Sequence, residues 1–228
     1  MDDSRRSLLP YARLAALAAC AGLSVEARPT SLTMVVSDRN GLAVEEVVVY
    51  AVAAEGDASA PVTDFSEPLV MNQQFEQFKP HILIVQTGSM ISFPNGDTVA
   101  HHVYSFSEPK RFELPLYQGT AHPPVTFDRP GVIDVGCNIH DHMEAHIVVV
   151  DTPYFAATGA DGRAEISDLP SGNYTVRIYS PRLRAADHPA PQGVAITNGD
   201  DAILQIQLEG RLRPPHLPET ESLNWSRY

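Results

Sequence analysis

The sequence predicts an all-β protein of two β-sandwiches, with a larger Greek-key sandwich inserted into a second, smaller one. Nineteen prolines and fourteen glycines among 228 residues are typical of short strands joined by turns. Short β-rich segments recur between Gly, Pro and Asn turns along most of the chain. Apolar residues at 43% exclude a disordered chain. A net charge of −12 argues against nucleic-acid binding, which needs clustered basic charge.

Residues 1–27 resemble an export signal. Arginines at 5, 6 and 13 precede a twelve-residue apolar stretch, and Val25-Glu26-Ala27 is a small-residue cleavage site. Twelve residues are too few for a membrane span, which needs about 20. We therefore expect export without a membrane span, with the bacterial periplasm as the destination.

The export route stays open. A general secretory signal fits, Ser4-Arg5-Arg6-Ser7-Leu8-Leu9 resembles a twin-arginine signal, and Leu17-Ala18-Ala19-Cys20 resembles a lipoprotein cleavage box, which is the weaker match. Cleavage after Ala27 leaves Cys137 as the single cysteine of the mature chain. A lone thiol in an oxidising compartment is a liability unless something, such as a metal ion, occupies it.

The rest of the chain divides into blocks of expected strands. Residues 28–54 contain strands at 31–37 and 43–52, which Asn40-Gly41 predicts to form a hairpin. A linker at 55–68 follows. Residues 69–152 are predicted to form an antiparallel sandwich with strands at 81–85, 90–93, 102–106, 112–117, 125–127, 132–136 and 147–150. Residues 153–208 contain strands at 163–167, 174–179 and 202–208, and residues 209–228 are expected to form a frayed polar tail.

The flanking blocks carry a resemblance in two pieces. The stretch from Val35 to Val44 resembles the opening hairpin of carboxypeptidase-regulatory-like (prealbumin-like) β-domains. The turn from Thr158 to Arg163, followed by residues 169–176, resembles their closing half. The resemblance implies one discontinuous module interrupted by residues 69–152, without catalysis. The alternative is two unrelated hairpins that flank one domain.

The segment from Gly136 to Met143 carries the strongest chemical signal. It places Cys137, His140 and Met143 at C-x2-H-x2-M spacing in a short loop between two expected strands. Soft sulfur combined with imidazole suits copper, and a blue-copper site needs one more histidine. The segment after Asn95 supplies it, because His101 lies 36 residues before Cys137.

On these residues, positions 70–151 resemble a cupredoxin of the plastocyanin/amicyanin type. The resemblance implies one type 1 copper, with His101, Cys137 and His140 as equatorial ligands and Met143 as the axial ligand. His102 occupies a position where the family often has an Asn that ties the two ligand loops together. It remains the alternative first ligand. Consecutive strand residues point to opposite faces, so only one of the two histidines can face the metal.

The expected function is therefore periplasmic electron transfer, not enzymatic catalysis. The resemblance implies a redox partner protein, such as a c-type cytochrome or a periplasmic dehydrogenase, docking on an apolar patch beside His140 that includes Ile139 and Pro123. Residues 64–151 carry eleven acidic and four basic side chains, which suits a basic partner or serves solubility alone.

The main alternative is a periplasmic copper chaperone or resistance protein, favoured by the additional His142 and His146. A nitrite-reductase-like enzyme would need a second, substrate-binding copper, and a dinuclear copper site would need two cysteines. Zinc also binds Cys and His, but Met is a poor zinc ligand.

Overall fold

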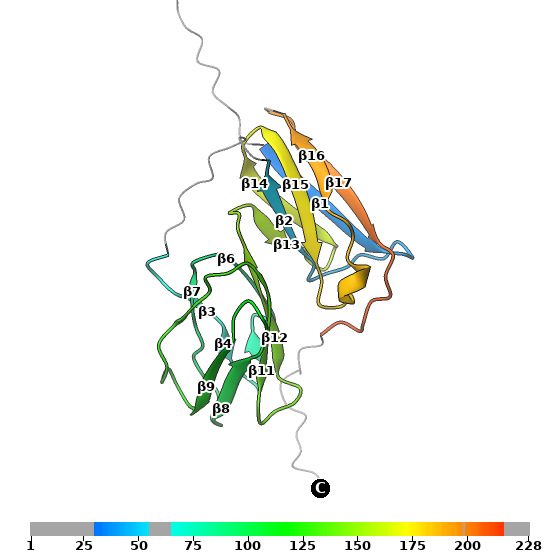
Figure 1. Cartoon of the computed structure of the whole chain (residues 1–228). Coiled ribbons are helices and arrows are strands. Elements are labelled where there is room, and N and C mark those ends of the chain that lie inside the picture. Colours follow the sequence, from blue (N-terminus) through cyan, green and yellow to red (C-terminus); the bar gives the residue numbers. More distant parts are fainter. Residues whose placement is uncertain (1–29, 55–64, 198, 217–228) are drawn as a thin grey trace, which may run out of the picture.

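The computed structural model describes residues 30–54, 65–197 and 199–216, and its regular structure is almost all strand (Figure 1). This confirms the all-β fold class. The one helical element in these residues is a 3-10 turn, η1 (Ala185–Asp187). No helix in this part of the chain is long and apolar enough to cross a membrane. The expected export signal lies outside the described residues.

Strands from both ends of the described chain build one unit, here called the flanking sandwich (upper half of Figure 1). One sheet has the order β14-β1-β17 and the other the order β13-β2-β15-β16. The strands are β1 (Thr30–Asp38), β2 (Val48–Ala53), β13 (Phe155–Ala157), β14 (Arg163–Leu169), β15 (Gly172–Tyr179), β16 (Gln192–Ile196) and β17 (Ala202–Leu208). Alternate residues of β1 are buried, and they form a core with those of the facing sheet.

The intervening residues build a second unit, here called the central sandwich (lower half of Figure 1). Its main sheet has the order β6-β12-β11-β8-β9, and it faces the small sheets β10-β7-β3 and β4-β5. The strands are β3 (Leu69–Val70), β4 (Asn72–Gln73), β5 (Phe78–Lys79), β6 (Ile82–Gln86), β7 (Met90–Ser92), β8 (His101–Ser105), β9 (Phe112–Tyr117), β10 (Val125–Thr126), β11 (Gly131–Cys137) and β12 (Glu144–Val150). Phe78, Phe127 and Ile133 are among the fully buried side chains between the two layers.

The two sandwiches pack against each other along a seam. Val148 and Val150, on the outer face of β12, form a small apolar cluster with Val48 of β2. Tyr50, Phe155 and other partly buried side chains from both units surround this cluster. The outer face of one sheet of the central sandwich is therefore covered by the flanking sandwich instead of water.

The expected hairpin of residues 31–37 and 43–52 is wrong. The Asn-Gly turn does form, with Gly41 at φ +80 and its N–H donating to the carbonyl of Asp38. After two more bonds, from Asp38 N–H to Leu42 O and from Val44 N–H to Val36 O, the chain turns away at Glu46, where φ is +58. It then enters the opposite sheet as β2, because the pairing partners of β1 are β14 and β17.

The expected antiparallel arrangement is also wrong in part. Strands β6 and β12 pair in parallel, as do β3 and β7, and β1 and β17 do the same in the flanking sandwich. The two strands of each pair are separated in the chain by other elements, so no tight turn sets their direction.

The sequence patterns missed several elements. β13, β3, β4 and β5 have two or three residues each, and β16 contains a glycine, so none gives a clear alternating pattern. Residues 209–216 are not frayed. Arg213 N–H donates to Arg182 O, the Arg182 guanidinium donates back to Arg213 O, and Leu212 packs on the flanking core.

Candidate metal centre

Three strands bring the predicted site residues to one end of the central sandwich. β11 ends at Cys137, β12 begins after Met143, and β8 begins at His101. The loop between β11 and β12 is closed by main-chain bonds from Cys137 N–H to Met143 O (3.1 Å) and from Met143 N–H to His140 O (3.0 Å). Antiparallel pairing of Cys137 with Val103 places β8 beside this loop.

Three possible ligand atoms form a nearly regular triangle. Nδ1 of His101 lies 3.2 Å from Nδ1 of His140, and Sγ of Cys137 lies 3.9 and 3.7 Å from these two nitrogens. A point equidistant from the three atoms lies about 2.1 Å from each, which matches metal–nitrogen bonds and is slightly shorter than metal–sulfur bonds. Among the described residues, no other group of three His, Cys, Asp or Glu residues is this compact.

The centre is buried except on one side. His101 is fully buried, and Cys137 and Met143 are 4% and 1% exposed. The side chain of His140 is 20% exposed, so its ring reaches the surface. Met143 belongs to the same core cluster as Cys137, and its carbonyl accepts the main-chain N–H of Cys137 across the loop.

A carboxylate that the sequence analysis missed holds His101. Oδ2 of Asp97 lies 2.8 Å from Nε2 of His101, and the carboxylate also accepts hydrogen bonds from the N–H groups of Phe75 and Glu76. Burial of the carboxyl raises its pKa, but these hydrogen bonds outweigh burial and the pKa of Asp97 is lowered. An ionised Asp97 accepts the Nε2 proton and leaves Nδ1 of His101 free to bind a metal, as is usual for ligand histidines.

The structure distinguishes between the two neighbouring histidines. His102 points to the other face of β8, where its Nε2 lies 2.9 Å from Glu113 Oε1. The link between the two ligand segments, which the family resemblance assigns to a side chain at 102, is made here by the main chain. Asn138 N–H donates to His102 O over 3.1 Å.

Buried amide and phenol groups support the loop before β8. The side-chain amide of Asn95 donates to Val99 O and Tyr117 O, and its oxygen accepts the N–H of Asp97. Burial raises the pKa of Tyr117 to about 12, so its hydroxyl stays protonated and donates to Phe93 O. This network fixes Asp97, and through it His101. The sequence hint was the Asn-Gly-Asp turn four residues before His101.

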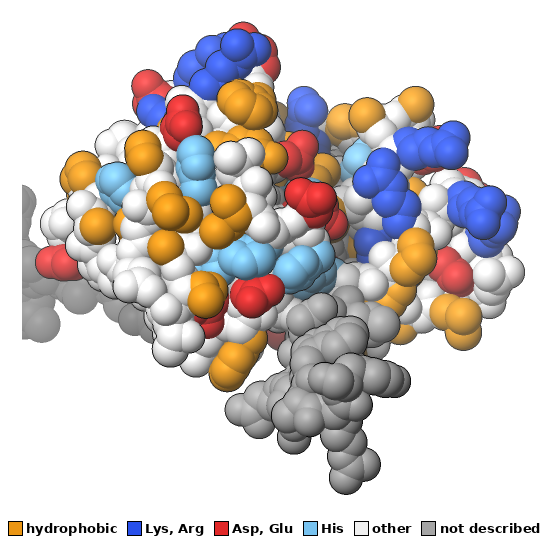
Figure 2. All heavy atoms as spheres, turned by 90° about the horizontal axis from the view of Figure 1, so that it is seen from below, with side chains coloured by type: hydrophobic (Ala, Val, Ile, Leu, Met, Phe, Trp, Pro, Cys, Tyr) orange, Lys and Arg blue, Asp and Glu red, His pale blue; other side chains and the backbone are white. Residues whose placement is uncertain are grey.

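Apolar and imidazole side chains share the surface around the centre (Figure 2). The predicted patch residues are both exposed, Ile139 at 51% and Pro123 on the neighbouring loop. His142 is nearly half exposed, and its Nε2 lies 3.6 Å from Glu76, whose carboxylate also lies 3.9 Å from Nε2 of His140. His122 bonds instead to Pro115 O, and His81 and His146 lie elsewhere, at the seam.

Copper fits this donor set. The centre offers one thiolate and two imidazoles in a compact triangle, with a buried thioether in the same core. This combination of ligands favours copper over zinc, calcium or magnesium. The described residues offer one such thiolate, because Cys137 is their single free cysteine.

Comparison with solved structures returns copper proteins over less than half of the chain. The Cu-containing nitrite reductase (NirK) from Thermus scotoductus SA-01 is 24% identical over 43% of this chain, with a TM-score of 0.35, and this chain spans 25% of that one. A reduced and an oxidised amicyanin mutant are each 19% identical over 44% of this chain and 99% of theirs, with TM-scores of 0.34. No protein-family model and no curated protein matches. The arguments about the centre therefore rest on its own geometry.

Proposed function

We propose that this chain is a periplasmic electron-transfer protein with one type 1 copper bound by His101, Cys137, His140 and Met143. The triangle of two imidazole nitrogens and one thiol sulfur, with sides of 3.2 to 3.9 Å, carries the proposal. Three ligand atoms already in place bind either oxidation state of copper with little movement of the protein. A small structural change on oxidation is what an electron carrier needs.

Copper, when bound, supplies the one-electron change between its +1 and +2 states. The chain supplies the rest. Asp97 orients His101, and the main-chain bonds of the loop fix Cys137 and Met143. The partly exposed ring of His140 is the one ligand at the surface, so it is the expected point of electron entry and exit.

The proposed partner is a redox protein that docks over His140. Ile139 and Pro123 offer apolar contact there, and the acidic central sandwich favours a basic partner such as a c-type cytochrome. We propose a carrier and not an enzyme, because all four proposed ligands are protein side chains and three of them are buried, which suits electron transfer more than substrate binding at the metal. The proposed domain limits are 69–152 for the inserted copper domain and 28–54 with 153–208 for the prealbumin-like module.

The second candidate function is copper delivery or resistance. His142 and Glu76 beside His140 favour it, because exposed side chains of this kind can pass an ion to or from a buried site. Competition with a copper(I) chelator separates the two functions. A carrier keeps its copper over many redox cycles, whereas a delivery protein releases it when a partner or chelator is present.

Titration of the wild type with Cu(II), followed by visible spectroscopy, tests the proposal. The expected result is that the first equivalent of copper gives an intense thiolate-to-copper absorption band that further copper does not increase, and that this centre has a reversible midpoint potential. Cys137→Ala should lose the band with the fold intact by circular dichroism. His122→Ala changes a histidine outside the centre and should keep the absorption band. If Cys137→Ala keeps both the stoichiometry and the spectrum, the proposal is wrong.

A further inference from the structure

A second group of histidines lies at the seam between the two sandwiches, here called the seam cluster: His81, His146 and His216. His146 is on β12, His81 directly precedes β6, and His216 ends the described C-terminal segment. The rings of His81 and His146 meet edge to face with centroids 5.3 Å apart, and His216 stacks on His81 at 3.9 Å. The proposed copper centre uses none of them.

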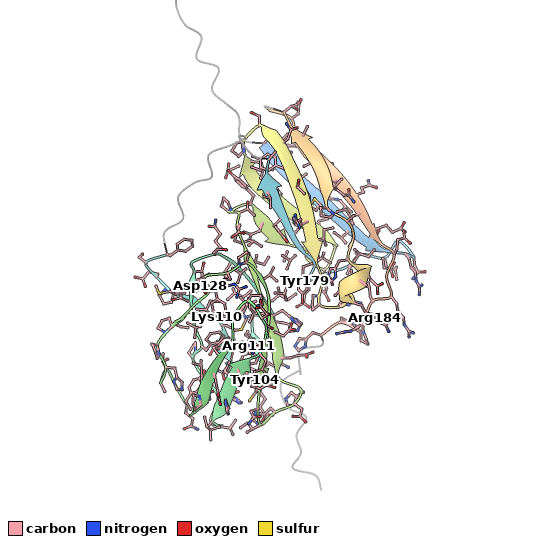
Figure 3. The ribbon with its side chains drawn as sticks, in the orientation of Figure 1. Tyr104, Lys110, Arg111, Asp128, Tyr179 and Arg184 are labelled. Atoms are coloured by element: carbon pink, nitrogen blue, oxygen red, sulfur yellow. The ribbon has the colours of Figure 1, made fainter. Side chains whose placement is uncertain are left out.

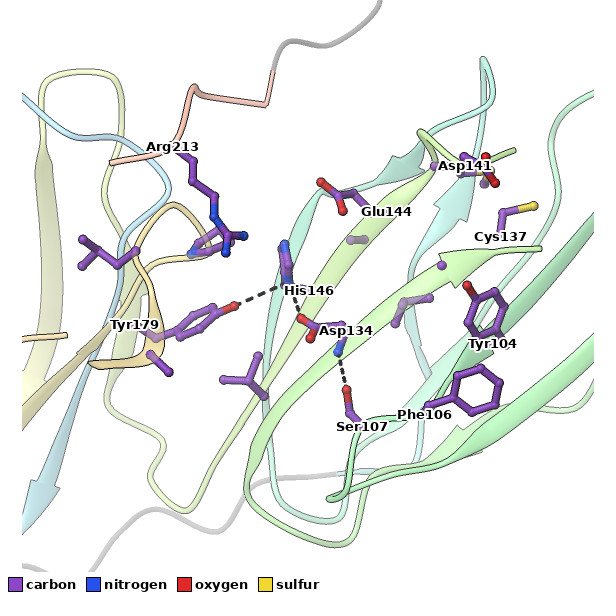
Figure 4. Close-up of a pocket in the computed structure, with 18 of the residues that line it drawn as sticks. Tyr104, Phe106, Ser107, Asp134, Cys137, Asp141, Glu144, His146, Tyr179 and Arg213 are labelled. Carbon is purple, nitrogen blue, oxygen red and sulfur yellow. Dashed lines mark hydrogen bonds and ion pairs between the residues drawn. The ribbon is translucent and has the colours of Figure 1, made fainter. Parts of the chain in front are cut away.

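Two of these histidines are each held by a carboxylate. Nδ1 of His81 lies 3.2 Å from both oxygens of Glu46, which belongs to the flanking sandwich. Nδ1 of His146 lies 2.8 Å from Oδ1 of Asp134 on the adjacent strand β11 (Figure 4). Each carboxylate holds a proton on Nδ1 and so leaves Nε2 with a free lone pair. Carboxylate–histidine pairs of this kind orient metal-ligating imidazoles in proteins.

The free nitrogen of His81 is buried. The His81 side chain is 10% exposed, and its Nε2 has no hydrogen-bond partner among the described residues. A buried nitrogen without a partner destabilises the fold, because it has lost its hydrogen bonds to water. A metal ion that accepts the lone pair would remove this destabilisation.

Other groups favour a cation at this place. Hydrogen bonds from His81 and His146 lower the pKa values of Glu46 and Asp134, so both carboxyls are ionised at neutral pH. Burial lowers the pKa of His216, which favours the neutral ring.

The seam cluster borders a cleft between the sandwiches. The cleft has a volume of about 930 Å³ and is lined by His146, Glu144, Tyr179 and Arg213, among others. The Tyr179 hydroxyl lies 3.5 Å from Nδ1 of His146, and Tyr179 projects from the flanking sandwich (Figures 3 and 4). An ion would therefore reach His146 from solvent through this cleft.

We propose that His81 and His146 bind a divalent transition-metal ion, Zn²⁺ or Cu²⁺, through their Nε2 atoms. The ring of His216 supplies the third ligand. Imidazole donors suit both ions, and the absence of a thiolate among these three residues distinguishes the site from the Cys137 centre. The seam cluster is not preassembled, because no three of its ligand atoms lie within 4.8 Å of one another. His216 has to rotate out of its stack, whereas His81 and His146 are already oriented by their carboxylates.

A bound ion would couple the two sandwiches. It would join the start of β6, strand β12 and the C-terminal segment, and Glu46 would connect it to the flanking sandwich through His81. Because an ion that binds only the folded chain stabilises it by mass action, the bound metal should raise the melting temperature of the protein.

The test uses the full chain with the first centre removed, as the double variant His101→Ala, Cys137→Ala. Equilibrium dialysis against Zn²⁺ should give one bound ion per chain, and adding His81→Ala or His146→Ala should abolish it. Glu46→Gln should weaken Zn²⁺ binding by about 10–100-fold, as removal of a ligand-orienting carboxylate does elsewhere. His216→Ala should weaken binding less than His81→Ala. His122→Ala is the control and should leave binding unchanged.

Two further measurements complete the test. Cu²⁺ in place of Zn²⁺ should give an electron paramagnetic resonance spectrum with imidazole nitrogen couplings and no thiolate band, and the relative affinities identify the preferred ion. In the wild type with its Cys137 centre filled by one equivalent of copper(I), Zn²⁺ should raise the melting temperature and His81→Ala should remove this rise, which covers the case of a double variant that fails to fold. Equal metal binding by wild type, His81→Ala and His146→Ala chains would overturn the proposal. None of these results depends on electron transfer at Cys137.

Discussion

The two sandwiches bury polar side chains in different ways. In the flanking sandwich and its connection to the central one, the buried polar residues are hydroxyls: Thr30, Thr152, Thr158 and Ser180. Each hydroxyl bonds to a main-chain group nearby, as Thr158 does to Val44 O and Val47 N–H. The central sandwich also buries the hydroxyls of Ser89 and Ser105, but in addition it buries the amides of Gln73, Gln77 and Asn95 and the imidazole of His101.

Three of the buried polar groups of the central sandwich, Gln73, Asn95 and His101, belong to one network where its ligand segments meet. Gln73 donates to Tyr117, Asn95 donates to Tyr117 O and accepts from Asp97, and Asp97 holds His101 beside Cys137. Hydroxyls of the flanking sandwich close turns and connections, whereas the amide, carboxylate and imidazole groups of the central sandwich orient a set of ligands. Two sandwiches of similar construction thus differ in whether buried polarity supports the fold or a site.

The largest expected effect in this comparison follows from Asp97→Asn. The neutral amide removes the carboxylate that holds Nε2–H of His101, so copper affinity should fall by about 10–100-fold. The measurement is competition for copper(I) with a chelator of known affinity. Asp128→Asn makes the same change of charge in the turn after β10, where Asp128 pairs with Lys110 at 3.5 Å (Figure 3), and should leave affinity unchanged. Equal losses in both variants would mean that net charge, and not orientation of His101, sets the affinity.

An effect on stability alone is expected from Thr158→Val in the flanking sandwich. The change removes a buried hydroxyl that serves Val44 O and Val47 N–H, and leaving these groups unpaired should lower the free energy of unfolding by about 1–3 kcal/mol. Urea denaturation followed by circular dichroism measures it. Thr126→Val, at an exposed position of β10, should stay within about 0.5 kcal/mol of wild type. The comparison fails if Thr158→Val changes the copper spectrum while the chain stays folded.

The smallest expected effect is the loss of stability at low pH that follows from protonation of Asp38. The Leu42 N–H donates to the Asp38 carboxylate and lowers its pKa below the ordinary value of 3.8. A carboxyl with a lowered folded-state pKa contributes stability above the unfolded value, and this contribution is lost as pH falls through the folded value. In a nuclear magnetic resonance titration, the chemical shift of the Asp38 carboxyl should therefore change with a midpoint below pH 3.8. A midpoint at or above this value would show that the turn does not hold the carboxylate.

The local parts of the candidate site could be read from the sequence. Cys137, His140 and Met143 lie within seven residues, so one loop brings them together whatever the rest of the fold does. The alternation of side chains along a strand limited the choice at 101 and 102 to one residue, but which of the two faces inward depends on how β8 sits in its sheet. The structure places His101 inward, with Tyr117 as its partner on β9.

Contacts between distant segments could not be read in this way. Asp97 approaches His101 only because the turn after Asn95 folds back, and Glu46 reaches His81 only because the two sandwiches pack together. The fold itself shows the same limit. β-branched and alternating patterns predicted most strands, but the crossover of the chain at Glu46 and the parallel pairing of β6 with β12 depend on tertiary packing and not on local turns.

X-ray absorption spectroscopy of the protein loaded with one equivalent of copper tests the central claim most directly. We expect a first coordination shell with two imidazole nitrogens and one short bond to sulfur, which is lost in Cys137→Ala. The shell should be nearly the same in the oxidised and reduced states, because the three ligand atoms are already positioned by the fold. A shell of nitrogen and oxygen alone, or one unchanged by Cys137→Ala, would rule out a copper centre at Cys137.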